Sequence, residues 1–503
     1  MDYSRVRSVA IVGAGVAGLA TARSLLALGL DCTLFERSKV PGGVWSDGYV
    51  NFGVQVQREL YEFPDWPLPK GTPDFTPGPV IQQYLCDFAD RFGIRQHIRF
   101  ETEVVSIESA EQTSTVTLRH AGVEESLNFD LVVVCIGLYS NQPHLIDIPG
   151  RDRFGGEVMH NSQLKSAGQL TDRRVAVVGY GKSATDAVLE AAVAARSAHL
   201  IFRKAHWPIP RKLAGVLPFK WGLLQRLNLT LLPPYQYATA VEKAVHSLGR
   251  PLVWLYWRLV ETLLYFQCNL GSRRGSRVSL VSSTPIEVDA FGESTMVPRP
   301  EFFRWIRDGQ IQPHNTTVET FTETGVELAD GTRLELDLLI LATGWKTDFS
   351  FIDASTWAAL EPADDGFYLY RHILHPATPG LVFIGRAASI SSVLTYCLQA
   401  HWLARLIDGT VRLPDAAGMQ ANIADMRAWK RAWMPFSSSR SARLIAHTQH
   451  YHDELLRDMR LNPLRKRGWL APLREVFDPY EPNDYADLFE SPPTGSTAGV
   501  SAG

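Results

Sequence analysis

The chain has 503 residues, which is too long for one compact core and predicts two or more domains. Its composition, 45% hydrophobic and 20% charged, is that of an ordinary globular protein with ample material for a core. The formal net charge of −3 does not favour a polyanionic partner, so we expect no binding to nucleic acid.

The five cysteines are scattered, odd in number and never spaced as C-x-x-C. This pattern argues against a disulfide framework and against a zinc site, and it indicates a reducing compartment. The chain enters a strand by Val9 and leaves no room for a secretory signal peptide. We therefore expect a cytoplasmic protein without a bound metal.

The segment 9-VAIVG-13 is an apolar run typical of a buried parallel strand. It leads through G-x-G-x-x-G into an apolar helix, and the next strand, 32-CTLFE-36, ends in an acid. Such glycines allow a tight turn and a close approach to a pyrophosphate at the helix N-terminus, and the acid binds a ribose diol. The turn predicts a dinucleotide site made of Gly13, Ala14, Gly15, Val16, Ala17, Gly18 and Glu36.

A second glycine turn, 41-PGGVW-45, follows, and we place Gly43, Val44 and Trp45 along the same cofactor. The strand–turn–helix pattern then returns at 175-VAVVGYGKSATDA-187, with Gly179, Gly181 and Ala184 at the three small positions. Here the second strand, 199-HLIFRK-204, ends in Arg203 and Lys204 instead of an acid. The guanidinium of Arg203 can form charge-assisted hydrogen bonds with a 2′-phosphate, whereas a carboxylate would repel it. The second site is therefore predicted to bind NADP(H).

Two nucleotide sites in one chain imply electron transfer from NADPH to a retained cofactor with a free ribose, most naturally FAD. A disulfide as electron acceptor would need a cysteine pair, which the sequence lacks, and no Ser-His-Asp arrangement or metal cluster stands out. Molecular oxygen is therefore the leading electron acceptor.

Between the two units, 154-FGGEVMHNSQLK-165 resembles F-x-G-x-x-x-H-x-x-x-[FY]-[KR], the fingerprint of flavin-containing monooxygenases. Phe154, Gly156, His160 and Lys165 match, while Leu164 replaces the usual aromatic residue. The resemblance covers nearly the whole chain. It extends to 61-YEFPDWPLP-69, 337-DLLILATGW-345, 382-VFIGRAAS-389 and the tail 461–489, which is similar to plant enzymes that N-hydroxylate small amino acids.

The resemblance implies a class B flavoprotein monooxygenase that works through a C4a-hydroperoxyflavin and oxygenates an amine, an amino acid or a sulfide. It also implies roles for further residues. Gln55 stands where many animal members carry a catalytic asparagine, with Gln57 as the fallback, and His160 organises the hinge or the NADP site. By the same similarity, Gln55, Val56 and Val104 join the FAD site, and Val54, Gln55, Ser183, Thr185 and Asp186 join the NADP site.

We expect an α/β protein with two Rossmann-like dinucleotide-binding domains, a helical insertion and a C-terminal helical extension. The FAD domain is expected at 1–169 plus 331–446, and the NADPH domain at 170–330 with the insertion at about 205–280. The extension spans 447–490, and a disordered tail spans 491–503.

The most apolar stretch, 252–266, contains Arg258 and Glu261 and is shorter than the roughly twenty apolar residues of a membrane span. We expect a buried or capping helix, and the alternative is a helix that rests on a membrane surface or on another subunit. The aromatic residues of the insertion (Trp207, Trp221, Trp254, Trp257) fit a substrate pocket and core packing equally well.

Two other functions remain open. A Baeyer–Villiger monooxygenase uses the same flavin chemistry on a ketone, but its related fingerprint ends in Trp-Pro where this chain has Leu164 and Lys165. The other is an NADPH oxidase that releases peroxide, or a binding protein without catalysis. No carboxylate-binding residue stands out, although Arg211 and Lys212 lie close to the nucleotide motif.

Overall fold

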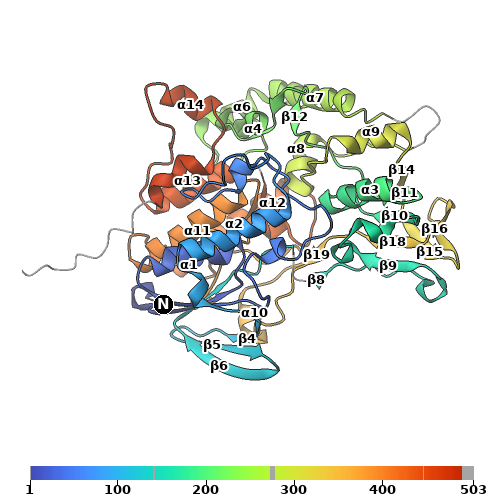
Figure 1. Cartoon of the computed structure of the whole chain (residues 1–503). Helices are drawn as coiled ribbons and strands as arrows, with labels where there is room; N and C mark the ends of the chain where they lie inside the picture. Colours follow the sequence, from blue (N-terminus) through green and yellow to red (C-terminus); the bar gives the residue numbers. More distant parts are fainter. Residues whose placement is uncertain (1, 140–141, 272–277, 446, 490–503) are drawn as a thin grey trace, which may run out of the picture.

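The computed structural model describes residues 2–139, 142–271, 278–445 and 447–489, so the expected tail 491–503 lies outside the described residues. The described residues include two five-stranded parallel sheets, of which the second lies at the right in Figure 1. The first has the order β20-β7-β1-β2-β3, with strands Leu381–Phe383, Leu131–Val134, Ser8–Val12, Asp31–Phe35 and Ile98–Arg99. The second has the order β14-β11-β10-β18-β9, with strands Gln312–Asn315, Ser197–Phe202, Arg174–Val178, Leu338–Leu341 and Glu157–His160.

Each sheet contains one strand–helix–strand unit at its centre. In the first, α1 (Val16–Leu26) connects β1 to β2, and in the second, α3 (Lys182–Ala194) connects β10 to β11. The strands β7 (LVVV) and β18 (LLIL) are buried at every position because apolar clusters cover both faces of each sheet. The expected α/β fold with two Rossmann-like units is confirmed.

The sheets divide the chain differently from the expected boundaries. The strands β9 and β18 lie outside 170–330, yet both are hydrogen-bonded into the second sheet beside β10. The expected FAD-domain segment 331–446 therefore contains one strand, β18, that belongs to the second sheet. A buried apolar run fits any parallel sheet, and its pattern does not say which one. The chain crosses between the sheets through β8 (Gln142–Pro143) and β19 (Trp345–Lys346), which pair with each other.

A three-stranded antiparallel sheet accompanies each parallel sheet (Figure 1). The one beside the first sheet consists of β4 (Thr102–Glu108), β5 (Ser114–His120) and β6 (Val123–Phe129). The one beside the second consists of β15 (Val318–Phe321), β16 (Gly325–Leu328) and β17 (Arg333–Glu335).

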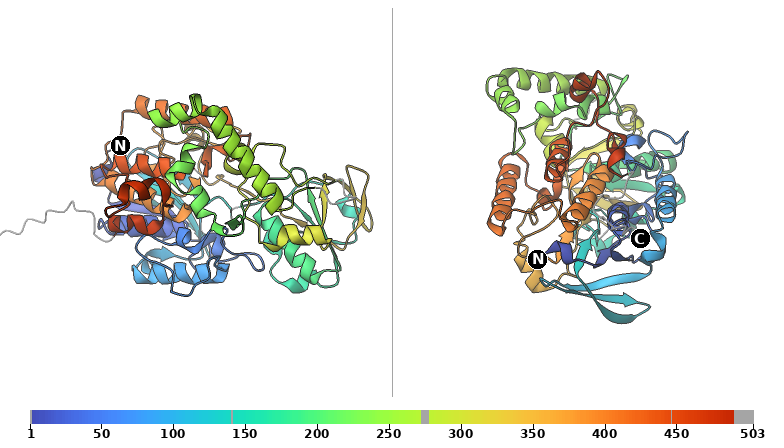
Figure 2. Two further views of the ribbon diagram at one scale, coloured as in Figure 1. Left: turned by 90° about the horizontal axis from the view of Figure 1, so that it is seen from above. Right: turned by 90° about the vertical axis from the view of Figure 1, so that its left-hand side faces the viewer.

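The insertion forms a helical layer along one edge of the molecule, as Figure 2 shows from two further sides. It contains β12 (Lys212–Leu213), β13 (Leu217–Pro218), α4 (Lys220–Leu223), α5 (Arg226–Thr230), α6 (Ala240–Ser247) and α7 (Arg250–Gln267). In α7 only Trp257 and Leu264 are buried, whereas Leu252, Trp254 and Leu259 are 72%, 60% and 60% exposed. Of the two forms expected, a buried helix or a capping helix, α7 is not the buried one. The helix covers the second core with one side and leaves an apolar side in solvent.

The C-terminal segment is part of the core. In α13 (Thr448–Asp458), Tyr451 and Leu455 are fully buried against α11 (Ser392–Ile407), and the Gln399 amide donates a 2.8 Å hydrogen bond to the Tyr451 hydroxyl. Arg226 of the insertion binds Asp453 of α13 at 2.7 Å and the Tyr480 hydroxyl at 2.8 Å. These contacts join the insertion to the end of the chain, where α14 (Ala471–Phe477) packs against α5.

The remaining α-helices are α2 (Gly78–Arg91), α8 (Ile286–Val288), α9 (Glu301–Asp308), α10 (Ala354–Ala359) and α12 (Ala416–Trp433). Among the described residues, none of the helices combines the length and the hydropathy that crossing a membrane requires.

Candidate active site

The first glycine turn is closely packed between β1 and α1. Gly13 has a φ of +100°, and a Cβ atom there would lie 2.9 Å from the Cys135 carbonyl oxygen. A Cβ atom on Gly18 would lie 1.9 Å from the Gly13 carbonyl oxygen. Side chains are therefore excluded at both positions, and Gly15, the N-cap residue of α1, provides no side-chain cap for the amides of the first turn.

The second glycine turn lies against the first. The Gly42 amide donates a 2.9 Å hydrogen bond to the Ala14 carbonyl oxygen, and a Cβ atom on Gly15 would lie 3.6 Å from the Gly43 Cα atom. The side chain of Val44 is 39% exposed, whereas Trp45 is buried and stacks on Phe52 at 5.8 Å between ring centroids. The two turns thus form one surface of small residues that suits an extended pyrophosphate.

Glu36 follows the last residue of β2 and is buried. Its carboxylate accepts a 2.8 Å hydrogen bond from the Ala14 amide and a 2.9 Å hydrogen bond from the Ser38 amide. The Thr102 amide donates to the Glu36 carbonyl oxygen at 3.0 Å, which places β4 and its residue Val104 beside the same strand end. The structure therefore gathers the first glycine turn, Glu36 and β4 at one edge of the first sheet.

The second dinucleotide turn repeats this geometry. Gly179 has a φ of +137°, and a Cβ atom there would lie 2.5 Å from the Ala342 carbonyl oxygen and 3.2 Å from the Ala184 Cβ atom. Gly181 caps α3, and a Cβ atom on it would meet nothing within 4 Å. The open space above Gly181 is where a pyrophosphate would lie.

The two basic residues at the end of β11 differ in their surroundings. The Gly179 amide bonds to the Ile201 carbonyl oxygen at 2.9 Å, so Arg203 and Lys204 emerge beside the second glycine turn. Arg203 is exposed, and within the described part of the chain its guanidinium has no ion-pair partner. Lys204 is instead paired with Glu293 and lies 3.8 Å from Asp289.

The side chain of Asp186 points away from open space. It is fully buried, accepts a 2.7 Å hydrogen bond from the Tyr49 hydroxyl, and forms ion pairs with Lys182 and with Arg299 at 3.2 Å. Burial lowers the pKa of Lys182, although Asp186 acts in the opposite direction. The Thr185 hydroxyl donates to the Lys182 carbonyl oxygen at 2.9 Å. Sequence reasoning missed Tyr49 and Arg299, whose partners are far away in sequence.

Gln55 lies between the two units. The preceding residue, Val54, is buried in the core of the first sheet, and the following residue, Val56, is buried in the core of the second. Gln55 is half-buried, and its amide has no hydrogen-bond partner among the described residues. Gln57, the fallback, is buried, and its Oε1 atom also lacks a partner there.

The fingerprint residues contact three segments that are distant in sequence. The His160 Nε2 atom lies 3.1 Å from the Gly344 carbonyl oxygen, and burial lowers the pKa of the His160 imidazole. Phe154 stacks on Phe321, and a Cβ atom on Gly156 would lie 2.3 Å from the Phe154 ring. Lys165 donates to the Asp47 carboxylate at 2.6 Å, which ties the fingerprint to the segment that leads to Gln55.

The model of the family described as "FMO-like: Flavin-binding monooxygenase-like" matches residues 6–244 and 301–464. A protein named "Probable flavin-containing monooxygenase 1" from Arabidopsis thaliana is 30% identical over 96% of this chain and 97% of its own length.

Solved structures agree with this fold. S-allyl-L-cysteine S-oxygenase from Allium sativum superposes with a TM-score of 0.63 at 21% identity, covering 93% of this chain and 91% of that protein. An oxidized steroid monooxygenase bound to NADP gives a TM-score of 0.68 at 20% identity, covering 90% of this chain and 97% of the other. The chain belongs to the flavin-binding monooxygenase-like family, and it is an FAD-dependent NADPH monooxygenase.

Proposed function

We propose that this enzyme oxygenates a nucleophilic nitrogen or sulfur atom of a small molecule, with an amine, an amino acid or a sulfide as the substrate and O2 as the co-substrate. The observation that carries this proposal is the position of Gln55, whose neighbours in sequence belong to the cores of the two dinucleotide-binding units. Because the Gln55 amide has no hydrogen-bond partner in the described part of the chain, it is available to both cofactors at this junction. The S-oxygenase from Allium sativum supports sulfur as one target atom.

The residues that would hold FAD fit the group. Gly13 and Gly18 cannot carry side chains, because a Cβ atom on either would collide with backbone, so the glycine turn stays narrow enough for a pyrophosphate to approach. The chemistry supplied by bound FAD is acceptance of hydride from NADPH and activation of O2. The proposed FAD site consists of Gly13, Ala14, Gly15, Val16, Ala17, Gly18, Glu36, Gly43, Val44, Trp45, Gln55, Val56 and Val104.

The proposed NADPH site is centred on Gly181 and Arg203. Gly181 offers open space at the N-terminus of α3, and the Arg203 guanidinium, which has no ion-pair partner among the described residues, suits a 2′-phosphate. Thr185 and Asp186 act indirectly here, because both are buried and their polar groups already have partners in the protein. The full site consists of Val54, Gln55, Gly179, Gly181, Ser183, Ala184, Thr185, Asp186, Arg203 and Lys204.

The Baeyer–Villiger alternative has the same fold, since cyclohexanone monooxygenase gives a TM-score of 0.67 at 17% identity. One contact favours nitrogen or sulfur oxygenation. Lys165 stands where the Baeyer–Villiger fingerprint has proline, and its ammonium donates to Asp47 Oδ1 at 2.6 Å and to the Gly48 carbonyl oxygen at 3.2 Å. Proline could make neither bond, so the contacts of Lys165 with Asp47 and Gly48 fit the flavin-containing monooxygenase fingerprint and not the Baeyer–Villiger one.

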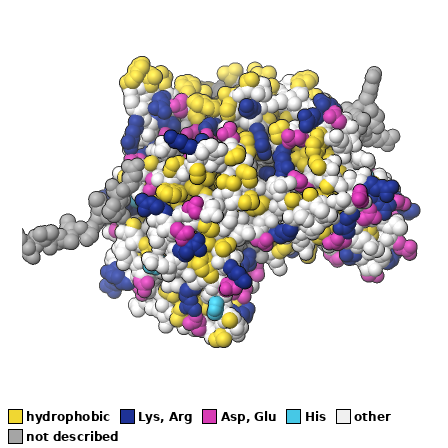
Figure 3. All heavy atoms as spheres, viewed as in Figure 1, with side chains coloured by type: hydrophobic (Ala, Val, Ile, Leu, Met, Phe, Trp, Pro, Cys, Tyr) yellow, Lys and Arg dark blue, Asp and Glu magenta, His cyan; other side chains and the backbone are white. Residues whose placement is uncertain are grey.

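We also propose a cytoplasmic location, in which the exposed apolar side of α7 contacts a membrane surface or another subunit. Figure 3 shows hydrophobic side chains gathered along the upper edge of the molecule, over α14 and the insertion. The exposed apolar side chains of these elements include Leu252, Trp254 and Leu259 of α7, Leu473 of α14 and Trp469 just before α14. Trp469 and Leu473 are 89% and 58% exposed. Exposed apolar side chains that gather on one face in this way favour an interaction surface.

The deciding experiment measures how NADPH oxidation is divided between substrate oxygenation and peroxide release. The purified yellow protein is reduced by NADPH without oxygen and then mixed with oxygen in the presence of amines, amino acids, sulfides or ketones. Oxygenated product from an amine or a sulfide, in amounts close to the NADPH consumed, supports the proposal. Product from ketones alone would establish the Baeyer–Villiger reaction, and stoichiometric peroxide with every substrate would establish an oxidase.

A further inference from the structure

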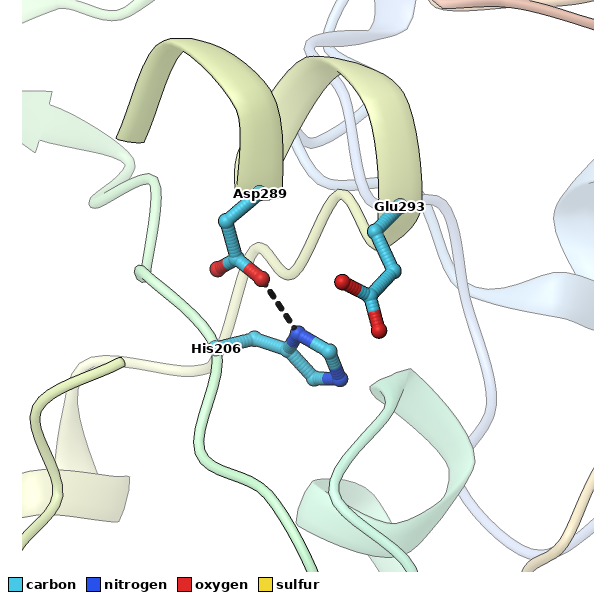
Figure 4. A group of neighbouring side chains, drawn as sticks. All are labelled: His206, Asp289 and Glu293. Atoms are coloured by element: carbon cyan, nitrogen blue, oxygen red, sulfur yellow. Dashed lines mark hydrogen bonds and ion pairs between the residues drawn. The ribbon is translucent and has the colours of Figure 1, made fainter. Parts of the chain in front are cut away.

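A group of charged residues surrounds the second of the two basic residues at the end of β11. His206, Asp289 and Glu293 bring one ligand atom each to within 4.8 Å of one another, and Figure 4 shows the two carboxylates extending from neighbouring turns toward His206. Asp289 and Glu293 are the first and last residues of a π-helical turn, Asp289–Glu293. Such turns are rare and frequently occur at functional sites.

The positive charge that faces both carboxylates is the Lys204 ammonium. It is paired with Glu293 and lies 3.8 Å from Asp289, so a divalent cation at this place would meet an ammonium among its ligands. This arrangement argues for an internal ion-pair network and against a metal centre.

The two carboxylates are not equivalent. Asp289 is fully buried and already has two strong partners, because its Oδ1 atom lies 2.8 Å from His206 Nδ1 and its Oδ2 atom accepts a 2.6 Å hydrogen bond from the Trp207 amide. Glu293 is partly exposed and pairs with Lys204, and the Arg443 guanidinium also interacts with it electrostatically. The Lys204–Glu293 pair is therefore the exchangeable contact of the group.

We propose that Glu293 is a specificity-determining residue that competes with the 2′-phosphate of the nucleotide for Lys204. The inference rests on the proposed NADPH site at Arg203. In the structure the ammonium beside Arg203 is neutralised by a carboxylate of the same chain. An arriving 2′-phosphate must share or displace this carboxylate, and the two negative groups repel each other. The charge of Glu293 thus weakens the preference for a 2′-phosphorylated nucleotide.

The test uses the purified full chain and two fragments of the nucleotide, 2′,5′-ADP and 5′-AMP, whose binding is measured by calorimetry without turnover. Glu293→Gln removes the charge and keeps the shape, and it should tighten 2′,5′-ADP binding about two- to fivefold, the size of one partly exposed ion pair. The affinity for 5′-AMP should stay unchanged. Glu287→Gln, whose carboxylate is paired with Arg258 at 2.6 Å, is the charge-matched control and should have no effect.

Lys204→Met completes the design. It should weaken 2′,5′-ADP binding, and Glu293→Gln added to Lys204→Met should give a smaller gain than in the natural chain, because the residue in competition is gone. Unchanged 2′,5′-ADP binding by Glu293→Gln overturns the inference. Weaker binding also overturns it and would show that Glu293 holds Lys204 in position for the nucleotide. If the natural chain binds 2′,5′-ADP no tighter than 5′-AMP, the proposed NADPH site fails and the inference fails with it.

Discussion

The Tyr49 hydroxyl donates a 2.7 Å hydrogen bond to the Asp186 carboxylate, and this bond joins the segment that carries Gln55 to helix α3 of the second unit. Three further hydrogen bonds join the same segments. The Asn51 side chain donates to Glu190 at 2.9 Å, and Arg299 donates to both Glu190 and the Asn51 carbonyl oxygen. Burial raises the pKa of Tyr49 well above its ordinary value, so the hydroxyl remains a donor throughout the ordinary pH range.

Tyr49→Phe should therefore lower the free energy of unfolding by about 1–3 kcal/mol, the cost of removing a hydrogen bond to a buried charge. The measurement is urea unfolding followed by fluorescence. Tyr256→Phe removes a 3.1 Å bond from a tyrosine hydroxyl to the neutral Asn228 side chain and serves as the control with a smaller loss. Equal losses for the two variants would contradict the role of the charged partner.

Gln55→Ala should leave flavin reduction by NADPH largely intact and should raise the fraction of NADPH consumed as peroxide. The physical reason is the loss of an amide that lies between the two cores and has no partner among residues 2–139, 142–271, 278–445 and 447–489. Peroxide and NADPH are measured together in the presence of substrate. Gln57→Ala is the companion variant, and uncoupling by this variant alone would transfer the role to Gln57.

Arg203→Ala should weaken NADPH binding by about 1–3 kcal/mol, the size of a lost charged hydrogen-bond pair, and should change NADH use little. Steady-state kinetics with both nucleotides measures the difference. Arg196→Ala removes another exposed arginine immediately before the opposite end of β11 and is the matched control. The assignment would be refuted by equal losses for NADPH and NADH.

Gly179 and Gly181 should respond differently to alanine. Gly179→Ala places a Cβ atom 2.5 Å from the Ala342 carbonyl oxygen and should destabilise the fold by about 1–3 kcal/mol. Gly181→Ala meets nothing within 4 Å, so the free energy of unfolding should stay within about 0.5 kcal/mol while NADPH binding weakens. Thermal unfolding and nucleotide titration measure the two effects. Unchanged NADPH binding in Gly181→Ala would move the pyrophosphate elsewhere.

Acid should destabilise the protein partly through His452, because burial lowers the pKa of this histidine to about 3, below its ordinary value of 6.5. Between these two values the unfolded chain binds a proton that the folded chain does not, so stability falls as the pH falls. His452→Gln should reduce the slope of unfolding free energy against pH by about 1.4 kcal/mol per pH unit in this range. Urea unfolding at several pH values checks this, and an unchanged slope would contradict it.

Local patterns were enough to find both dinucleotide turns. Gly13 and Gly179 lie at positive φ after buried strands, as their motifs predict, because a strand, a tight turn and a helix are encoded by residues close together in sequence. The same is true of the family, since the fingerprint from Phe154 to Lys165 is a short stretch. The sequence also indicated the helical character of the insertion. It placed β18 in the wrong unit, because a buried apolar run has the same pattern in either parallel sheet.

The amino-acid sequence by itself thus determined the two nucleotide-binding units and the family. It also determined that the second strand of the first unit is followed by an acid, Glu36, and that of the second unit by a base, Arg203. Only the tertiary structure decided which side chains meet across long distances in the chain. It placed Asp186 against Tyr49, Lys204 against Glu293 and Gln55 between two cores, and it left one side of α7 in solvent. The physical reason is that ion pairs, burial and junctions between sheets depend on packing between segments that sequence spacing does not relate.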